Sequence, residues 1–213
     1  GSSGHSRVII DIIEKESKYS IVGLIDSYKA LGEETLGYPV IGKDEDLKDL
    51  EKIHGLDAGI IAIGDNWLRY KTHKNILRIL PNFNFVNALH PNAEIGKNVT
   101  IGRGTVVMGG VVVNPNSKIG NHCILNTKCS LDHECSIGNY SSLAPGVTTG
   151  GNVKIGEFTA VSLGANVIHD VSIGNHTIIG AGSLVIKDVP DKSIYSGVPS
   201  KLIRKREKGE KYL

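Results

Sequence analysis

The chain of 213 residues carries 24 Lys and Arg residues against 22 Asp and Glu residues, a formal net charge of +2. This balance gives no overall electrostatic argument for a nucleic-acid-binding protein. No apolar run approaches the ~18 residues that a membrane-spanning helix needs, and no signal-peptide pattern opens the chain. Three cysteines are too few and odd in number for a disulfide framework, so we expect a cytoplasmic protein that binds neither nucleic acid nor membrane.

The N-terminal part, residues 1–88, has no repeat and predicts a small Rossmann-like α/β domain. Apolar, β-rich runs predict strands, and apolar residues at helical spacing predict helices. The expected strands cover 19–26, 58–64 and 83–89, and the expected helices cover 6–16, 44–53 and 66–80. Alternating strands and helices favour a parallel sheet with ligands at the carboxyl ends of the strands.

Several candidate ligand-binding residues follow these expected strands. The opening "GSSGHS" is a glycine-bearing loop before a helix, whose backbone amides suit a phosphate. The candidates are Ser2, Gly4 and His5 in this loop, Asp26 at a strand end, and Gly64, Asn66 and Arg69 after the next strand. A phosphate loop of this kind needs a preceding strand, so either residues upstream of Gly1 are missing or the loop is a plain turn or a cloning remnant.

From residue 93 to residue 188 the chain repeats every six residues, in sixteen hexads without an insertion. The third position is Ile, Val or Leu in fifteen hexads, the first is small or β-branched, and the fourth is Gly in eight. The side chains at positions one and three lie on one side of a strand, and a glycine at position four permits a tight turn directly after that strand. Three hexads per coil predict an all-β parallel β-helix over 89–213, with ~4.8 Å between coils.

The repeat decides how the cysteines are interpreted. Cys123, Cys129 and Cys135, with His133 between the last two, resemble the ligands of a zinc site. All three cysteines occupy the inward-facing first position, however, and successive hexads lie on different faces of the coil. We therefore expect the thiols to fill the core from three sides and to bind no metal.

One outer face of the expected β-helix is apolar. Its second-position residues, spaced eighteen apart, are Val106, Ile124, Ser142, Ala160 and Ile178. Exposing such a stripe to water is costly, so we expect it to mediate self-association. The alternative is that the N-terminal segment covers it.

The order of motifs resembles that of bacterial sugar acetyltransferases, which join a nucleotide-binding domain to a left-handed β-helix. The motifs are "GSSGH", "LID", "AIGDN" with Arg69, "LHPNAEIG", the hexads with "DHE", and "SGVPSK", and they span essentially the whole chain. The family includes N-acetyltransferases of UDP-4-amino-4,6-dideoxy sugars and O-acetyltransferases of sialic acids. The resemblance implies acetyl-CoA as co-substrate, a nucleotide sugar as acceptor, and homotrimers with active sites at subunit interfaces.

The resemblance also assigns roles to residues of the β-helix. His133 corresponds to the family's general base, with Glu134 or Asp132 to orient the imidazole. Gly151 lies eighteen residues later, so the repeat places its backbone beside His133, where the thioester carbonyl is polarised. The residues implied in cofactor binding are Asn126, Ser142, Gly151, Leu163, Gly164 and Ala181. Ser142 is a departure, because some N-acetyltransferases of the family carry a second histidine at this position.

The remaining polar residues and the alternatives stay open at this point. His169 is two coils from His133, about 10 Å away, and we expect His122, His176, His54, His73 and His90 to be turn, helix-surface or structural residues. The basic tail after Ser200 either meets the phosphates of CoA or is solvated.

N-acetylation of a nucleotide-linked amino sugar is the first hypothesis, O-acetylation of a sialic acid the second, and a non-catalytic nucleotide-sugar-binding scaffold the third. A carbonic-anhydrase-like β-helix would need a triad of converging histidines, and this sequence shows no such triad.

Overall fold

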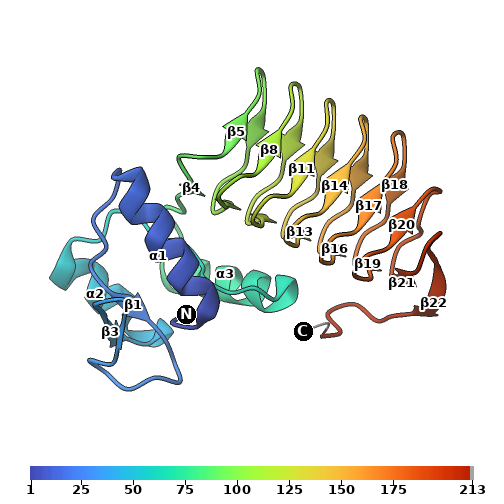
Figure 1. The fold of residues 1–213 in the computed structure, drawn as a ribbon. Helices are drawn as coiled ribbons and strands as arrows, with labels where there is room; N and C mark the ends of the chain where they lie inside the picture. Colours follow the sequence, from blue (N-terminus) through green and yellow to red (C-terminus); the bar gives the residue numbers. More distant parts are fainter. Residues whose placement is uncertain (212–213) are drawn as a thin grey trace.

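The hexads form a parallel β-helix, and a computed structural model describes it together with the rest of residues 1–211 (Figure 1). Each hexad contributes one two-residue strand from its second and third positions. Strands eighteen residues apart pair in parallel, as Ile124 does with Ser142 and Ser136 with Lys154. Three hexads therefore close one coil, as the sequence predicts.

The strands of the β-helix stack into three flat sheets. The first sheet contains β4 (Ala88–Leu89), β7 (Val106–Val107), β10 (Ile124–Leu125), β13 (Ser142–Leu143), β16 (Ala160–Val161), β19 (Ile178–Ile179), β21 (Ser193–Ser196) and β22 (Lys201–Lys205). The second contains β5 (Glu94–Ile95), β8 (Val112–Val113), β11 (Ser130–Leu131), β14 (Thr148–Thr149), β17 (Asn166–Val167) and β20 (Leu184–Val185). The third contains β6 (Thr100–Ile101), β9 (Lys118–Ile119), β12 (Ser136–Ile137), β15 (Lys154–Ile155) and β18 (Ser172–Ile173). The tail after Ser200 forms β22, whose five residues are exposed and pair antiparallel with β21.

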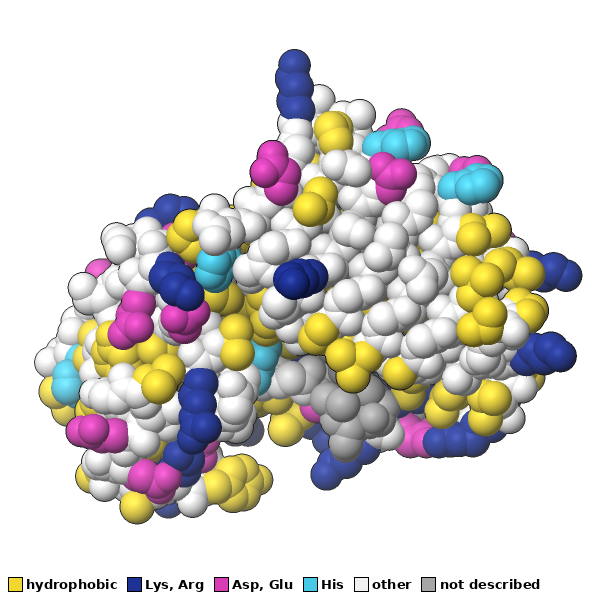
Figure 2. Space-filling view, in the orientation of Figure 1, with side chains coloured by type: hydrophobic (Ala, Val, Ile, Leu, Met, Phe, Trp, Pro, Cys, Tyr) yellow, Lys and Arg dark blue, Asp and Glu magenta, His cyan; other side chains and the backbone are white. Residues whose placement is uncertain are grey.

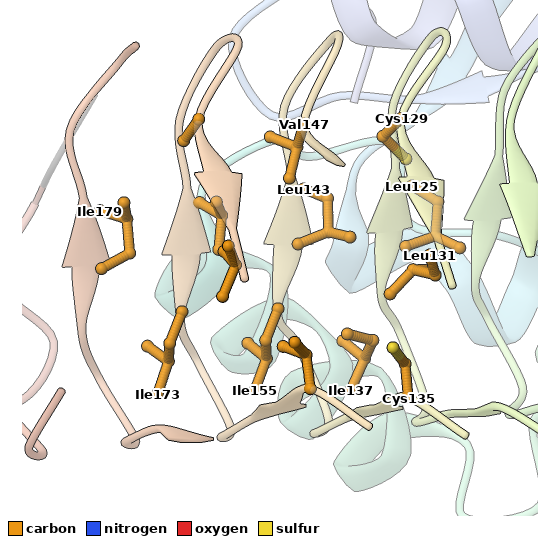
Figure 3. Packing of buried hydrophobic residues seen from close by; sticks show 14 of the residues in the cluster. Leu125, Cys129, Leu131, Cys135, Ile137, Leu143, Val147, Ile155, Ile173 and Ile179 are labelled. Carbon is orange, nitrogen blue, oxygen red and sulfur yellow. The ribbon is translucent and has the colours of Figure 1, made fainter. Parts of the chain in front are cut away.

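The core of the β-helix is filled from first and third hexad positions (Figure 3). The three cysteines belong to this core, with exposed fractions of 0% for Cys123, 0% for Cys129 and 1% for Cys135. Burial raises the pKa of the Cys123 thiol to about 11 and that of Cys129 to about 12, so both stay protonated at neutral pH. The prediction that the thiols are core residues is confirmed.

The prediction of the turns is wrong about the hexad position at which the backbone adopts a positive φ. It is the sixth position that adopts positive φ, in glycines and also in residues such as Glu134 (φ 60°) and Tyr140 (φ 58°). The glycines at the fourth position serve close approach instead. A Cβ on Gly138 would lie 2.6 Å from the backbone nitrogen of Glu157 in the next coil, so any larger residue there pushes the coils apart.

The N-terminal domain has helices and a small sheet. Its elements are α1 (Gly4–Glu16), β1 (Leu24–Ile25), β2 (Glu34–Thr35), β3 (Tyr38–Gly42), a 3₁₀ turn (Asp44–Asp46), α2 (Leu47–His54) and α3 (Asn66–Ile79). The three expected helices are confirmed, with shifted ends. No helix among residues 1–211 is both long and apolar enough to cross a membrane.

The predicted strands of this domain are only partly right. The sheet has the order β1-β3-β2, with β1 parallel to β3 and β2 antiparallel to it, so it is mixed rather than parallel. The expected strand over 58–64 forms a single bridge between Gly59 and Phe85. The expected strand over 83–89 ends as β4, which pairs with β7, so the β-helix begins at Ala88.

The apolar stripe on the first sheet is covered by the chain's own N-terminal domain. α1 lies between the small sheet and the β-helix (Figure 1) and packs Ile9, Ile12 and Ile13 against Val106 and Ile124. The expectation that this stripe mediates self-association is therefore wrong, and the alternative of cover by the N-terminal segment is confirmed. The stripe is apolar because it is an intramolecular core.

A buried arginine completes this domain junction. Arg69 is 1% exposed and donates from Nε to the carbonyl oxygen of His122 and from Nη2 to that of Tyr140. Its Nη1 donates to the carbonyl oxygens of Ile63 and Gly64, each at 2.9 Å. The guanidinium thus binds the end of the N-terminal domain to one corner of the β-helix, with its donors directed to specific carbonyls.

The same corner carries a column of stacked rings that the sequence analysis did not identify. His122, Tyr140, Phe158 and His176 occupy sixth positions of successive coils and stack within 8° of parallel. Rings of α3 pack against the column from the side, including Trp67, Tyr70 and His73. His73, expected on a polar helix surface, instead lies within hydrogen-bonding distance of the Tyr140 hydroxyl, with 2.7 Å between Nδ1 and Oη.

Acid should loosen this junction. Burial, together with His73 and Arg69, lowers the pKa of His122 to about 3. Between pH ~6.5 and pH ~3 the imidazole of His122 is protonated in the unfolded chain but neutral in the folded chain. The free energy of unfolding therefore falls by up to about 1.4 kcal/mol for each unit by which the pH decreases in this window. His122→Phe keeps a stacked ring and removes the proton site, so its melting temperature should fall less between pH 7 and pH 4.5.

His54→Phe is the matched control, because His54 lies on the exposed end of α2. Calorimetry at both pH values measures the effect. An equal loss of melting temperature in His122→Phe and in the unsubstituted protein would contradict this assignment.

Candidate active site

A polar corner of the β-helix lies where β11 of the second sheet turns into β12 of the third. Asp132, His133 and Glu134 form this turn. Figure 2 shows histidine side chains beside acidic ones along the upper edge of the β-helix, uncovered on this face. The side chains of His133 and Glu134 are 58% and 60% exposed.

Asp132 fixes the backbone of this turn. Its Oδ1 accepts from the backbone N–H of His133 at 2.8 Å and from Nδ2 of Asn114 at 3.0 Å. These two hydrogen bonds lower the pKa of Asp132, so the carboxylate stays charged. Asn114 was not predicted, although it occupies the position eighteen residues before Asp132 and the repeat therefore places it alongside.

Glu134 contacts the imidazole itself. Its Oε2 lies 3.0 Å from Nδ1 of His133. A carboxylate at Nδ1 favours the tautomer with a proton on that nitrogen, and it leaves Nε2 with a lone pair. Glu134 and Asp132, which the sequence could not distinguish, thus contact the ring and the backbone respectively.

Gly151 lies directly beside the ring, as the eighteen-residue register predicts. A Cβ at this glycine would stand 2.6 Å from both Nε2 and Cε1 of His133. Only a glycine lets the imidazole rest against the backbone of the next coil. Within residues 1–211 the Gly151 N–H donates no hydrogen bond to protein, while its carbonyl accepts from Asp170 at 3.0 Å.

The other predicted cofactor-binding residues lie at a different corner. Asn126, Leu163, Gly164 and Ala181 follow strands of the first sheet, where it turns into the second. The width of the second sheet separates them from His133, so one chain does not bring the two groups together. Leu163 is 57% exposed at this corner.

Ser142 lies at the domain junction. Its Oγ donates to Oδ1 of Asn66 at 3.0 Å, and Asn66 is 1% exposed and donates to the carbonyl oxygen of Thr159. Asn66 also accepts from Arg69. Buried in this way, Asn66 and Arg69 hold the two domains together and do not reach an open substrate site, which corrects their predicted role; Gly64 contributes a carbonyl to the same junction.

The remaining N-terminal candidates do meet at one edge of the small domain. The Ser2 N–H donates to Oδ2 of Asp26 at 2.7 Å, and Oδ1 of Asp26 accepts from the backbone of Tyr28 and Lys29. Burial acts to raise the pKa of Asp26, but these backbone hydrogen bonds outweigh it and lower the pKa. The opening loop and the end of β1 therefore converge, as predicted.

α1 begins at this edge with Gly4 and His5. Its N-cap, Ser3, makes no side-chain hydrogen bond to the first turn, which leaves backbone N–H groups directed outward. His5 has a buried Nε2 without a hydrogen-bond partner among residues 1–211, and burial together with Arg69 lowers its pKa to about 4. His5 is thus neutral at neutral pH.

No group of three His, Cys, Asp or Glu side chains within residues 1–211 is arranged to hold a metal ion. The corner at His133 pairs an imidazole with a carboxylate, an arrangement that is suited to proton transfer.

Comparison with known proteins identifies the family. Residues 1–76 match the PglD N-terminal domain family, and residues 92–127 match the bacterial transferase hexapeptide family of six repeats. A variant of perosamine N-acetyltransferase from Caulobacter crescentus, solved with CoA and GDP-perosamine, is 37% identical with a TM-score of 0.89 over 95% of this chain and 93% of that chain. The chain belongs to the nucleotide-sugar acetyltransferase family.

Two further solved structures resemble this acetyltransferase at lower identity. The acetyltransferase domain of PglB from Neisseria gonorrhoeae, in complex with acetyl coenzyme A, is 28% identical with a TM-score of 0.87, over 95% of this chain and 96% of that one. WeeI from Acinetobacter baumannii is 26% identical with a TM-score of 0.86, over 95% and 97%. No curated protein matches the sequence. The predicted left-handed β-helix with an N-terminal α/β domain, the acyltransferase class and the use of acetyl-CoA are confirmed.

Gly151→Ala tests the contact between this glycine and the imidazole of His133. The added methyl group must displace the imidazole, so kcat/KM for acetyl transfer should fall roughly 10²-fold, which is the cost of ~1 Å of misplacement. The melting temperature should change little, because the displaced ring is exposed.

The double variant with His133→Ala provides the control for this prediction. Once the ring is gone, Gly151→Ala should have no further effect on the residual rate. A similar loss from Gly151→Ala in both backgrounds would show that the glycine acts independently of His133.

Proposed function

We propose that this acetyltransferase moves the acetyl group of acetyl-CoA to the amino group of a nucleotide-linked amino sugar, with His133 as general base. The observation that carries the proposal is the imidazole held by Glu134 at Nδ1, with Nε2 against the backbone of Gly151. N-acetylation is favoured over O-acetylation because the relative that is 37% identical is a perosamine N-acetyltransferase.

The reaction needs one group that accepts a proton and one group that donates a hydrogen bond to the oxyanion. As the sugar amine attacks the thioester carbonyl, Nε2 of His133 takes the amine proton, and Glu134 stabilises the imidazolium that forms. The Gly151 N–H is suited to donate a hydrogen bond to the thioester carbonyl oxygen, which becomes negatively charged during the attack. Breakage of the C–S bond then releases CoA, whose thiolate recovers the proton from His133, and no acyl-enzyme is formed.

We assign the binding site for the nucleotide-sugar acceptor to the N-terminal domain. The relative with 37% identity is solved with GDP-perosamine, and the N-terminal edge of this chain offers the first turn of α1, the Ser2 loop and Asp26. The α1 amides suit a diphosphate and the Asp26 carboxylate suits a hydroxyl or base N–H. We take a UDP-linked 4-amino-4,6-dideoxy sugar as the first candidate, with a GDP-linked sugar as the alternative.

Homotrimers with active sites between subunits form part of the proposal. Leu163, Gly164 and Ala181 lie at one corner of the β-helix and His133 at another, so a shared site needs two chains. In a cyclic trimer the first corner of one chain can face the second corner of its neighbour. Sedimentation should give a mass three times that of the 22.8 kDa chain, and a monomer would contradict the arrangement.

We also propose that the reaction takes place in the cytoplasm. The three free, buried cysteines suit a reducing compartment. Cell fractionation tests this location.

His133→Ala should reduce CoA release by roughly 10²–10⁴-fold, the contribution of general base catalysis. Free CoA is measured with a thiol reagent, using UDP- and GDP-linked 4-amino-4,6-dideoxy sugars and sialic acid as acceptors. His169→Ala is the matched control, because His169 is also exposed at this corner but two coils away, and it should retain activity.

Each outcome separates two hypotheses. Unchanged activity of His133→Ala would exclude this residue as the base. Release of CoA with sialic acid alone would establish O-acetylation, and no release with any acceptor would support the binding scaffold.

A further inference from the structure

One backbone hydrogen bond of the β-helix is missing at the corner that carries His133. Over residues 96–180, every other fourth-position N–H donates to a backbone carbonyl oxygen of the next coil, as that of Gly150 does to Val167 at 2.8 Å. Each such hydrogen bond is a rung of the β-helix. The N–H of Asp132 makes no rung within residues 1–211, and the carbonyl oxygen of Thr149, which the register places opposite it, accepts no hydrogen bond there.

The side chain of Thr149 takes the place of this carbonyl. The N–H of Asp132 donates to Oγ1 of Thr149 at 3.3 Å. Thr149 is the one third-position residue of the sixteen hexads that is not Ile, Val or Leu, and it is 4% exposed. A buried hydroxyl costs free energy unless it is hydrogen-bonded, so a threonine at this core position needs a partner. The polar exception in the repeat therefore lies beside the missing rung.

Cys135 extends this contact to the other side of the site. Its Sγ lies 3.5 Å from Oγ1 of Thr149 and donates to the carbonyl oxygen of Gly150 at 3.3 Å. Because the thiol proton is directed to Gly150, the Thr149 hydroxyl can donate its own proton to Sγ and accept from Asp132. A chain of three hydrogen bonds inside the core thus joins Asp132 to the residue before Gly151.

The missing rung changes the direction in which the turn leaves its strand. A rung directs the N–H along the axis of the β-helix, whereas the Thr149 side chain points into the core, so the Asp132 N–H is directed inward. The carboxylate of Asp132 accepts from the N–H of His133 and from Asn114. Asp132 is thus held through its N–H and through its carboxylate, directly before the residue that carries the imidazole.

We propose that Thr149 is a positioning residue of the acetyltransferase, whose hydroxyl keeps the rung at Asp132 open and sets the angle at which the imidazole of His133 rests against Gly151. This inference rests on the proposed role of His133 as general base. Without the hydroxyl, the Asp132 N–H loses its acceptor, and a buried N–H without a partner is costly, so the rung to the carbonyl of residue 149 closes. Closure draws the turn toward the next coil, where the imidazole is already in contact with the backbone of Gly151.

Thr149→Val tests this role, because it removes the hydroxyl and keeps the branched shape of the side chain. The value of kcat for acetyl transfer should fall roughly 10- to 100-fold, the effect of misplacing the base by up to ~1 Å. KM for both substrates should change little, because the interaction that is lost acts in the transition state. The melting temperature should not fall, because an aliphatic residue is usual at the third position.

Thr149→Ser provides the rescue. It keeps the hydroxyl and should retain most of kcat, although the lost methyl group lowers the melting temperature. A residue that only packs the core would give the opposite order, with full kcat in the valine variant and a larger defect in the serine variant. In a His133→Ala background, Thr149→Val should have no further effect on the residual rate.

Thr148→Val is the matched control. Thr148 precedes Thr149 in β14, and its hydroxyl lies 3.4 Å from Oγ of Ser130 on the exposed side of the second sheet. The same substitution there should change neither kcat nor the position of the turn 132–134.

A crystal structure of the Thr149→Val variant gives a readout that does not depend on acetyl transfer. It should show the Asp132 N–H donating to the carbonyl oxygen of residue 149, with the imidazole of His133 displaced from Gly151. An open rung with the imidazole in place would overturn the proposal, as would a valine variant with full kcat. If the unsubstituted protein releases no CoA with any acceptor, the proposed function fails, and the crystal structure still decides whether the Thr149 hydroxyl holds the turn.

Discussion

The stacking of one coil on the next constrains the rest of this molecule. Backbone hydrogen bonds join residues eighteen apart, such as Ile124 and Ser142, through the whole β-helix. Side chains at equal hexad positions are therefore superimposed about one strand spacing apart. This one constraint places Gly151 against His133, Asn114 against Asp132, and the rings from His122 to His176 in a column. Because the spacing is fixed by backbone, the polar corner at His133 is positioned by a rigid element rather than by a loop.

The N-terminal domain depends on the same constraint. The first sheet presents an apolar stripe because second-position residues of every third hexad align, and α1 covers that stripe with its isoleucines. Arg69 then donates to carbonyls of His122 and Tyr140, which the coil spacing holds at two successive sixth positions. Removing the guanidinium would leave buried carbonyl groups without donors, a large cost relative to any single apolar contact. The junction therefore fixes the N-terminal domain on one face and leaves the corner at His133 open.

Much of the β-helix was predictable from the sequence, because its register depends on local repetition. The burial of Cys129 and the contact between Gly151 and His133 follow from counting in sixes. Other features depend on contacts between distant segments, which a repeat does not encode. The stripe at Val106 and Ile124 is equally apolar whether a second chain or α1 covers it. Arg69 and Asn66 follow an apolar run, as ligand-binding residues do, but α3 turns them into the junction. The run 58–64 has strand composition, yet within residues 1–211 it forms one isolated bridge, between Gly59 and Phe85.

We propose that His133 acts as a base whose imidazole Glu134 orients through Nδ1. The pH dependence of kcat/KM for acetyl transfer, measured in the unsubstituted protein and in Glu134→Gln, tests this pairing. The rate should reach a plateau at high pH, and Glu134→Gln should lower that plateau, because the amide no longer stabilises the imidazolium that forms in the transition state. Superimposable profiles, with equal plateaus in the two proteins, would contradict the assignment of Glu134 and His133 as an acting pair.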